Sequence, residues 1–268
     1  MAPAALLLLL WASSHCEDAR AGAEQALRET ALLRGHRGQV HALQFSPDGK
    51  RLVSAGRDGR LIVWDSRSGR RRATLGDARG GSANAVSFSP DGGGLASGGD
   101  ARNLRLWELK GARETALLSG PIGAVSAVAY SPDGRRIAAG AWDSVVRLWG
   151  LPAGGARAAL ALRGHASAVN AIAFSPDGAW LASGGWDGRV ILWDRDGSRR
   201  ALFEPTEGWI WSLAFSPDSR MLAAATRSGA VLLWDVAQSS AMGALRGHEG
   251  AARTAPYASG TSRHGASG

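Results

Sequence analysis

Gly164 to Asp194, GHASAVNAIAFSPDGAWLASGGWDGRVILWD, is the stretch that decides the fold, because the same order of residues recurs along nearly the whole chain. Three short apolar runs in it are separated by two turn sequences. Pro176 has the fixed φ that suits the second position of a type I turn, which Gly178 ends. Asp187 and Gly188 tolerate the positive φ of a tight hairpin. The stretch therefore predicts a meander of three antiparallel strands.

Two landmarks repeat along the chain in step with each other. The turn prolines and the tryptophans that end the third run both show successive spacings of 43, 42, 44 and 41 residues. A period of about 40–45 residues with Gly-His and Trp-Asp marks is the signature of one four-stranded propeller blade per repeat. The tryptophans are Trp64, Trp107, Trp149, Trp193 and Trp234, and the prolines are Pro47, Pro90, Pro132, Pro176 and Pro217.

These marks resemble the WD-repeat (WD40) β-propeller family, and the resemblance covers about residues 29 to 250. It implies an all-β protein of four-stranded antiparallel blades, with five recognisable repeats and a degenerate partial sixth. We expect an apolar segment and linker at 1–28, the propeller at 29–246, and a degenerate repeat or disordered tail at 247–268.

The resemblance also implies a buried hydrogen-bond network in each blade, made of histidine, serine or threonine, aspartate and tryptophan. A buried indole N–H, imidazole and carboxylate each need a partner, so a fully satisfied network specifies how the strands pack. Only the first and fourth repeats hold all four residue types. The expected sets are His36, Ser54, Asp58 and Trp64, and His165, Ser183, Asp187 and Trp193.

The second, third and fifth repeats depart from this pattern, and we expect their blades to depend on apolar packing instead. The second keeps Ser97 and Trp107, the third keeps Asp143 and Trp149, and the fifth keeps Trp234. The departures are Arg79 and Ala101 in the second repeat, Pro121 and Ala139 in the third, and Thr206, Ala224 and Ser228 in the fifth.

Ring closure is the open question of this fold. Propellers of the family commonly have about seven blades, and each blade buries its faces against two neighbours. A sixth repeat opens at Leu245 to His248, but it lacks the Ser-Pro-Asp turn sequence. An outermost strand is predicted at Glu29 to Leu33, ahead of its own repeat, and another at Glu114 to Leu118. The alternatives are a truncated propeller, an imperfectly closed ring, and a ring that another chain completes. In isolation we expect an exposed apolar blade face and aggregation.

The apolar run from Ala4 to Ala12 is too short to span a bilayer as a helix, which takes about 20 apolar residues. It fits the core of a signal peptide, with small residues at Ala12 and Ser14, although no basic residue precedes it. A mis-started reading frame and a packed apolar arm are the alternatives, so the compartment, cytoplasmic or secreted, stays open. Cys16 is the only cysteine, which excludes an internal disulfide framework.

No sequence motif points to catalysis, and we predict no enzyme activity, cofactor or metal site. The chain lacks a Gly-x-Ser-x-Gly elbow, a His-Glu-x-x-His pair and a phosphate loop that ends in Gly-Lys-Ser/Thr. Three of its six histidines belong to the structural Gly-His pairs. Function therefore has to come from the surface.

One end of the propeller is predicted to be rich in tryptophan. The loops before each first strand and the Asp-containing hairpins emerge there, and Trp and Arg are the residue types most enriched at binding hot spots. The alternative role of these side chains is to cover the edges of neighbouring blades. The candidate binding residues are Trp142, Trp186, Trp209, Trp211, His41, Arg57 and Arg227.

The opposite end is predicted to be basic, in keeping with a formal net charge of +8. Basic loops suit nucleic acid, acidic proteins or an anionic membrane. A solvated, arginine-biased surface without a partner is the alternative. The arginines that map to its loops are Arg51, Arg67, Arg70, Arg71, Arg72, Arg135, Arg136, Arg195, Arg199 and Arg200.

We therefore predict a non-enzymatic scaffold that binds protein or peptide partners, through its tryptophan-rich end. One alternative is an adaptor whose basic end binds RNA or an anionic membrane. Another is an accessory propeller fragment of a larger chain that carries a catalytic domain. No transmembrane span is predicted.

Overall fold

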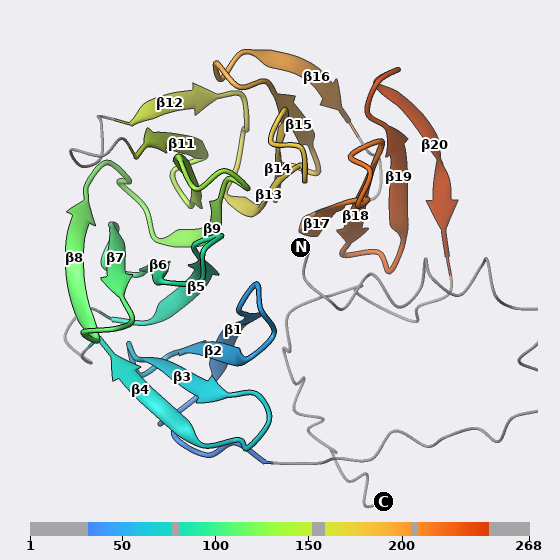
Figure 1. Cartoon of the computed structure of the whole chain (residues 1–268). Coiled ribbons are helices and arrows are strands. Elements are labelled where there is room, and N and C mark those ends of the chain that lie inside the picture. The colour runs from blue at the N-terminus through green and yellow to red at the C-terminus, as the bar shows by residue number, and fades with distance from the viewer. Residues whose placement is uncertain (1–31, 77–80, 152–158, 205–207, 247–268) are drawn as a thin grey trace, which may run out of the picture.

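The computed structural model describes residues 32–76, 81–151, 159–204 and 208–246. Within these ranges the chain forms five four-stranded antiparallel sheets and no helix, so it holds no helix that could cross a membrane. The sheets stand as successive blades around one axis, and the arc is open between the fifth blade and the first (Figure 1). The predicted all-β fold of four-stranded blades in an open ring is confirmed.

Each blade is a meander whose strands pair in chain order, with the first strand innermost. Blade one comprises β1 (Val40–Phe45), β2 (Arg51–Gly56), β3 (Leu61–Asp65) and β4 (Arg71–Leu75). Blade two comprises β5 (Ala83–Phe88), β6 (Gly94–Gly99), β7 (Leu104–Glu108) and β8 (Arg113–Leu118). Blade three comprises β9 (Val125–Tyr130), β10 (Arg136–Ala141), β11 (Val145–Gly150) and β12 (Leu160–Arg163). Blade four comprises β13 (Val169–Phe174), β14 (Leu181–Gly185), β15 (Val190–Trp193) and β16 (Arg199–Phe203). Blade five comprises β17 (Ile210–Phe215), β18 (Met221–Thr226), β19 (Val231–Asp235) and β20 (Ser240–Leu245).

Several predictions fall on residues that the structure does not describe. The segment 1–28, the partial sixth repeat at 247–268, Arg79 and Thr206 all lie outside the described ranges. Of the strand predicted at Glu29 to Leu33, only its last two residues are described, and neither is in a strand. Its counterpart, Glu114 to Leu118, falls in β8, the outermost strand of blade two, as predicted.

The Ser-Pro-Asp turns have the predicted tight geometry. In blade four the N–H of Gly178 donates to the carbonyl of Ser175 over 2.8 Å, and Gly178 has a φ of +67°. Ser175 Oγ donates to Asp177 Oδ1 over 2.5 Å. The same serine-to-aspartate bond measures 2.5–2.6 Å in the other four blades, so one turn geometry repeats throughout.

The hydrophobic core lies between the blades. In the first interface, Leu61, Val63 and Leu75 of blade one pack against Val86 and Phe88 of blade two. Three further clusters join blades two and three, three and four, and four and five. Each sheet therefore depends on a neighbouring sheet to bury its apolar faces.

The residue sets that the resemblance implies for blades one and four are hydrogen-bonded in the structure. In blade four, Trp193 Nε1 donates to Ser183 Oγ over 2.8 Å, Ser183 Oγ lies 2.8 Å from His165 Nε2, and His165 Nδ1 lies 3.0 Å from Asp187 Oδ2. The carboxylate only accepts, so Nδ1 carries the ring proton and the Ser183 hydroxyl donates to Nε2. The corresponding distances along Trp64, Ser54, His36 and Asp58 are 2.9, 2.7 and 2.9 Å.

Blade three lacks the four-residue network, as expected, but it has a buried polar pair that the sequence did not predict. Arg147 Nη2 lies 2.8 Å from Asp143 Oδ2, and both side chains are nearly buried. The N–H of Ile122 also donates to Asp143 Oδ2, over 2.7 Å. A buried carboxylate needs donors, and here an arginine of β11 does what the missing histidine does elsewhere.

Blades two and five also retain polar contacts. In blade two, Trp107 Nε1 donates to Ser97 Oγ over 2.8 Å. Asp100, one residue before the expected position at Ala101, accepts from the N–H of Ser82 over 3.2 Å. In blade five the hydroxyls of Thr226 and Ser228 lie 2.8 Å apart. These blades therefore lack the four-residue network, as expected, but keep single polar contacts in and near their hairpins.

The hairpin aspartates are held as carboxylates. Burial by itself raises the pKa of Asp187, but hydrogen bonds from His165 and from the N–H of Ala166 outweigh burial and lower the pKa below the ordinary 3.8. Burial also raises the pKa of Asp58 and of Asp143, and hydrogen bonds again outweigh burial, so that both pKa values are lowered. A carboxyl whose pKa falls on folding adds stability at pH values above its unfolded pKa.

We predict that Ser183→Ala lowers the free energy of unfolding by about 3 kcal/mol, because it leaves the Trp193 N–H and a ring nitrogen of His165 without partners. Ser97→Ala is the matched control, since its repeat holds no histidine, and it should cost about half as much. Urea unfolding followed by tryptophan fluorescence measures both. Equal losses would contradict the role of the histidine.

We also predict that the free energy of unfolding falls as the pH drops through 3.8 toward the lower pKa values of the folded hairpin carboxyls. Asp187→Asn should be less stable at pH 7 but lose less stability between pH 5 and pH 3, because it lacks one such carboxyl. Urea unfolding at pH 7, 5, 4 and 3 measures this dependence. The exposed Asp196→Asn is the control for charge alone. If the free energy of unfolding falls between pH 5 and pH 3 as much in Asp187→Asn as in wild type, Asp187 does not contribute to the acid dependence.

Candidate functional site

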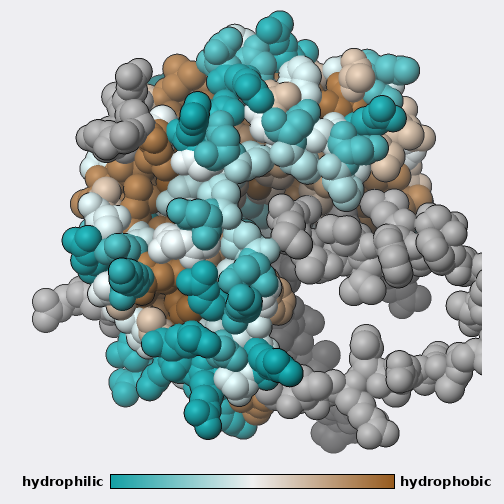
Figure 2. Space-filling model, in the orientation of Figure 1, coloured by the Kyte–Doolittle hydropathy of each residue, from teal (hydrophilic) through white to brown (hydrophobic). Residues whose placement is uncertain are grey.

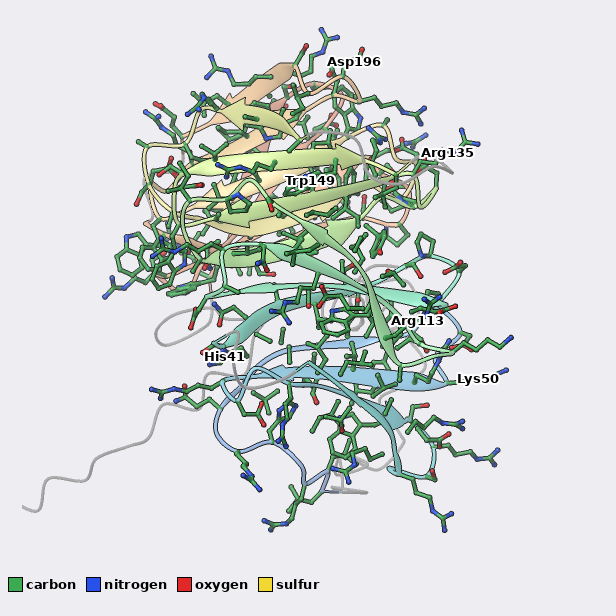
Figure 3. The ribbon with its side chains drawn as sticks, turned by 90° about the vertical axis from the view of Figure 1, so that its left-hand side faces the viewer. His41, Lys50, Arg113, Arg135, Trp149 and Asp196 are labelled. Atoms are coloured by element: carbon green, nitrogen blue, oxygen red, sulfur yellow. The ribbon has the colours of Figure 1, made fainter. Side chains whose placement is uncertain are left out.

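A β-bulge interrupts the innermost strand of every blade at its second residue. A bulge leaves one residue out of the pairing and re-aims its side chain. Figure 3 shows His41, the bulged residue of β1, at the end of the blades opposite Lys50 and Arg135. The bulged residues are His41, Asn84, Ser126, Asn170 and Trp211.

The hairpin between the second and third strands of each blade meets the start of the innermost strand. In blades three, four and five the N–H groups of Trp142, Trp186 and Arg227 each donate over 2.9 Å to the carbonyl of the residue before the innermost strand. Arg57 and Asp100 hold the same hairpin position in blades one and two, with bonds of 2.8 and 3.1 Å. These backbone bonds bring side chains of the hairpin and the bulge to one end of the molecule.

Four tryptophans of blades three, four and five form a continuous stack at this end, which we call the tryptophan ladder. The ring centroids of Trp142 and Trp186 lie 5.7 Å apart. Trp186 and Trp209 stack at 4.9 Å with an interplanar angle of 15°, and Trp211 meets Trp209 edge-on at 6.0 Å. Each aromatic pair adds about 0.5–1.5 kcal/mol beyond area burial. The ladder is therefore a stiff surface that crosses two blade boundaries.

Arg227 completes the ladder. Its guanidinium carbon lies 4.3 Å from the ring centroid of Trp209, which is a cation–π contact. Arg227 itself is exposed, so the positive charge stands beside the rings at the surface. The structure therefore brings together five of the seven predicted binding residues.

The ladder is only partly exposed. Trp142 is 54% exposed, whereas the other three rings are half-buried. The Nε1 atom of Trp186 is buried and has no hydrogen-bond partner among the described residues. Three rings thus cover blade edges, and Trp142 presents its ring to solvent.

His41 and Arg57 stand on blade one, away from the blades that form the ladder. His41 Nδ1 lies 3.0 Å from Asn84 Oδ1, and Asn84 Nδ2 donates to Asp100 Oδ1 over 3.0 Å. His41 therefore ties blade one to blade two. Sequence reasoning missed Asn84 and Asp100, although they occupy in the second repeat the positions of His41 and Arg57 in the first.

The basic end lies opposite the ladder and faces the viewer in Figure 2, where hydrophilic residues cover most of it. The prediction that all ten arginines lie in loops is wrong. The strands begin directly after tight turns, so strand-terminal residues share this end. Four arginines lie in turns, and six lie in strands, namely Arg51, Arg71, Arg72, Arg136, Arg199 and Arg200.

Several guanidinium groups of the basic end are already bound within the protein. Arg200 Nε donates to Asp194 Oδ2 over 2.7 Å, and Arg72 pairs with Asp65. Arg136 and Arg195 donate to the carbonyl of Gly178 over 3.0 and 3.2 Å. These contacts reduce the number of cationic groups that are free for a polyanion. In the part of the chain that the structure describes, no cluster of histidine, cysteine or acidic residues could hold a metal ion.

The chain matches the WD40 family, described as WD domain, G-beta repeat, at residues 27–65, 69–108, 113–150, 158–194 and 197–235. Similar proteins include β subunits of guanine nucleotide-binding proteins. The one from Nicotiana tabacum is 51% identical over 35 residues, which are 13% of this chain and 9% of the relative. Subunit beta-1 from Caenorhabditis briggsae is 48% identical over 40 residues, 15% of this chain and 12% of the relative. The subunit from Lymnaea stagnalis is 40% identical over 50 residues, 19% of this chain and 15% of the relative.

These alignments span between 9% and 15% of the length of the relatives, so they compare about one repeat with one repeat. The five family matches, by contrast, follow one another along most of the chain, and each one covers the first three strands of one blade. The second to fifth matches begin with the last strand of the preceding blade. The protein therefore belongs to the WD40 repeat family of β-propellers.

Proposed function

We propose that this protein is a non-enzymatic scaffold that binds a protein or peptide partner on the tryptophan ladder. The WD40 repeats and the similarity to β subunits of guanine nucleotide-binding proteins support a protein-interaction scaffold. The observation that carries the finer proposal is the exposure of Trp142, 54%, at the end of a stack that is otherwise half-buried. A large exposed ring on a stiff support is the usual form of a binding hot spot.

The ladder offers two kinds of contact to a bound segment. The face of Trp142 is an apolar platform for a proline, aliphatic or aromatic side chain. Arg227, held on Trp209, attracts an acidic side chain. These contacts favour an acidic segment with an apolar or proline residue, and binding needs little ordering of the ladder.

An adaptor whose basic end binds RNA or an anionic membrane is the second candidate. Its support is the net charge of +8 and the clustering of arginines opposite the ladder. The intramolecular contacts of Arg72, Arg136, Arg195 and Arg200 count against it. Salt distinguishes the two, because phosphate contacts release counterions and weaken steeply with added salt, whereas the ladder binds largely through apolar contact.

We predict that Trp142→Ala weakens peptide binding by about 10- to 100-fold, as expected for loss of a hot-spot ring. Peptides selected on the wild-type chain from a random library serve as ligands, and isothermal titration measures Kd at 50 and 300 mM salt. Leu160→Ala, at an exposed position on β12, is the matched control and should bind like wild type. If the selected peptides bind Trp142→Ala equally well, or lose most of their affinity at 300 mM salt, the ladder is not the binding site.

Trp186→Phe tests the role of the indole N–H separately from that of the stacked ring. It keeps an aromatic ring in the ladder but removes the buried donor that has no partner. We predict unchanged or slightly higher stability, because an unsatisfied buried group costs about 1–3 kcal/mol. Peptide affinity should stay unchanged, because the buried N–H does not reach a bound segment. Urea unfolding and titration measure the two properties, and a loss of stability would show that the N–H serves the fold.

A further inference from the structure

A hollow of 310 Å³ opens at the basic end between blades one and two. Its volume lies at the lower limit of the sites that bind small molecules in proteins, which measure about 300–1,000 Å³. Val63 and Ala73 of blade one line it, and so does Leu109, which follows β7 of blade two. These three residues give the hollow an apolar lining.

The leucine of this lining stands where blade four has an arginine. Leu109 and Arg195 each follow by two residues the tryptophan that ends the third strand region of their blade. Arg195 donates from Nε to the carbonyl of Gly178 and from Nη2 to that of Asp177, both over 3.2 Å. A leucine is shorter and has no donor, so the corresponding space in blade two stays unfilled.

Arg51, which also lines the hollow, is held in place while its hydrogen-bond donors stay unused. Its guanidinium carbon lies 5.8 Å from the ring centroid of Phe88. Arg136 holds the same position in blade three, but its guanidinium donates to the carbonyls of Arg195 and Gly178 over 3.1 and 3.0 Å. The Arg51 guanidinium makes no hydrogen bond within the described ranges.

Lys110 and Arg72 add two further cationic groups to the lining. Lys110 is exposed and has no ion-pair partner in the part of the chain that the structure describes. The corresponding residue of blade four is Asp196, so the charge at this position is reversed. Arg72 pairs with Asp65. No carboxylate is among the described residues that line the hollow, which therefore has two cationic groups without an ion-pair partner.

Two carboxylates in adjacent turns lie near the hollow but outside its lining. Asp48, which Arg51 reaches electrostatically, accepts from Ser46 Oγ over 2.6 Å within its own turn. Asp91 accepts from the N–H of Gly93 over 2.9 Å in the same way. Because both carboxylates are held by their turns, they do not close the hollow or pair with its cationic groups.

We propose that the hollow binds a phosphate monoester carried on an apolar group, such as an aryl phosphate. A phosphate monoester has a charge of about −1.5 to −2 at pH 7 and three acceptor oxygens, which match two cationic groups. The planar guanidinium of Arg51 binds two phosphate oxygens in parallel, and the ammonium of Lys110 binds the third. The apolar lining takes the carbon body of the ligand. The proposal is independent of the tryptophan ladder, which lies at the opposite end of the blades.

Phenyl phosphate is the probe, and isothermal titration at pH 7 measures its affinity. We expect a Kd of about 0.1–1 mM for the wild-type chain. Arg51→Met introduces the residue type that blade five has at this position, Met221, and should weaken binding about 10-fold or more. Arg136→Met changes the same position of blade three, removes the same charge, and should bind phenyl phosphate like wild type.

Leu109→Arg separates a defined site from a general attraction of charge. It copies the arginine of blade four and should fill the hollow, so binding should be lost although the variant gains a positive charge. Lys110→Asp, at an exposed position, should also weaken binding about 10-fold or more and tests the proposal if Arg51→Met does not fold. Circular dichroism and urea unfolding check the fold of each variant.

The source of the phosphate group is tested with a phosphotyrosine peptide flanked by alanines. A lower Kd than that of phenyl phosphate assigns the ligand to a partner protein, and an equal or higher Kd assigns it to a free small phosphate. Methyl phenyl phosphate, a diester with one negative charge like the nucleic-acid backbone, should bind about 10-fold more weakly or worse.

Four results overturn the proposal. They are the absence of phenyl phosphate binding by wild type up to about 10 mM, equal binding by Arg51→Met and Arg136→Met, unchanged or tighter binding by Leu109→Arg, and equal affinity for the diester, which would point to a nucleic acid instead.

Discussion

The structure depends on the packing of one four-stranded sheet against the next. A single blade has apolar residues on both faces, so it buries them only between two neighbours. Leu61, Val63 and Leu75 lose nearly all their exposure because blade two stands against them, and the same surfaces are used at each later boundary. Burial of such a side chain contributes about 1.5–3 kcal/mol. The described fold is therefore a sum of boundaries between neighbouring blades.

Polar contacts inside each blade serve a second requirement, which is to hold the hairpin on the loop that precedes the innermost strand. Asp58 and Asp187 do so with a histidine relay, while Asp143 does so with Arg147. The partner differs, but the carboxylate accepts a backbone N–H of that loop in all three blades. The requirement is for a satisfied buried carboxylate, and more than one donor meets it.

The candidate site arises from these same hairpins. Because each hairpin is bonded to the start of its innermost strand, the residue before the turn aspartate and the bulged residue of the innermost strand meet at one end of every blade. In blades three to five, three of these six positions hold tryptophan, and their rings join that of Trp209 in contacts across the boundaries. In blades one and two the same positions hold His41, Asn84 and Asp100, which form a polar tie instead. One scaffold thus supplies an aromatic surface on one side of the arc and a hydrogen-bonded seam on the other.

The sequence by itself determined the five described blades and their length, since paired landmarks at a steady spacing require equal units. It also placed the four tryptophans at one end of the blades, because their positions within the repeat follow from the spacing. Contacts between blades were decided only by the tertiary structure. The pairing of Asp143 with Arg147, the half-burial of Trp186 and the tie from His41 to Asn84 depend on side-chain directions that bulges and neighbouring sheets create. The exposure of Leu43, Phe45 and Leu245 also lies beyond local sequence, because the same residue types are buried wherever another blade follows.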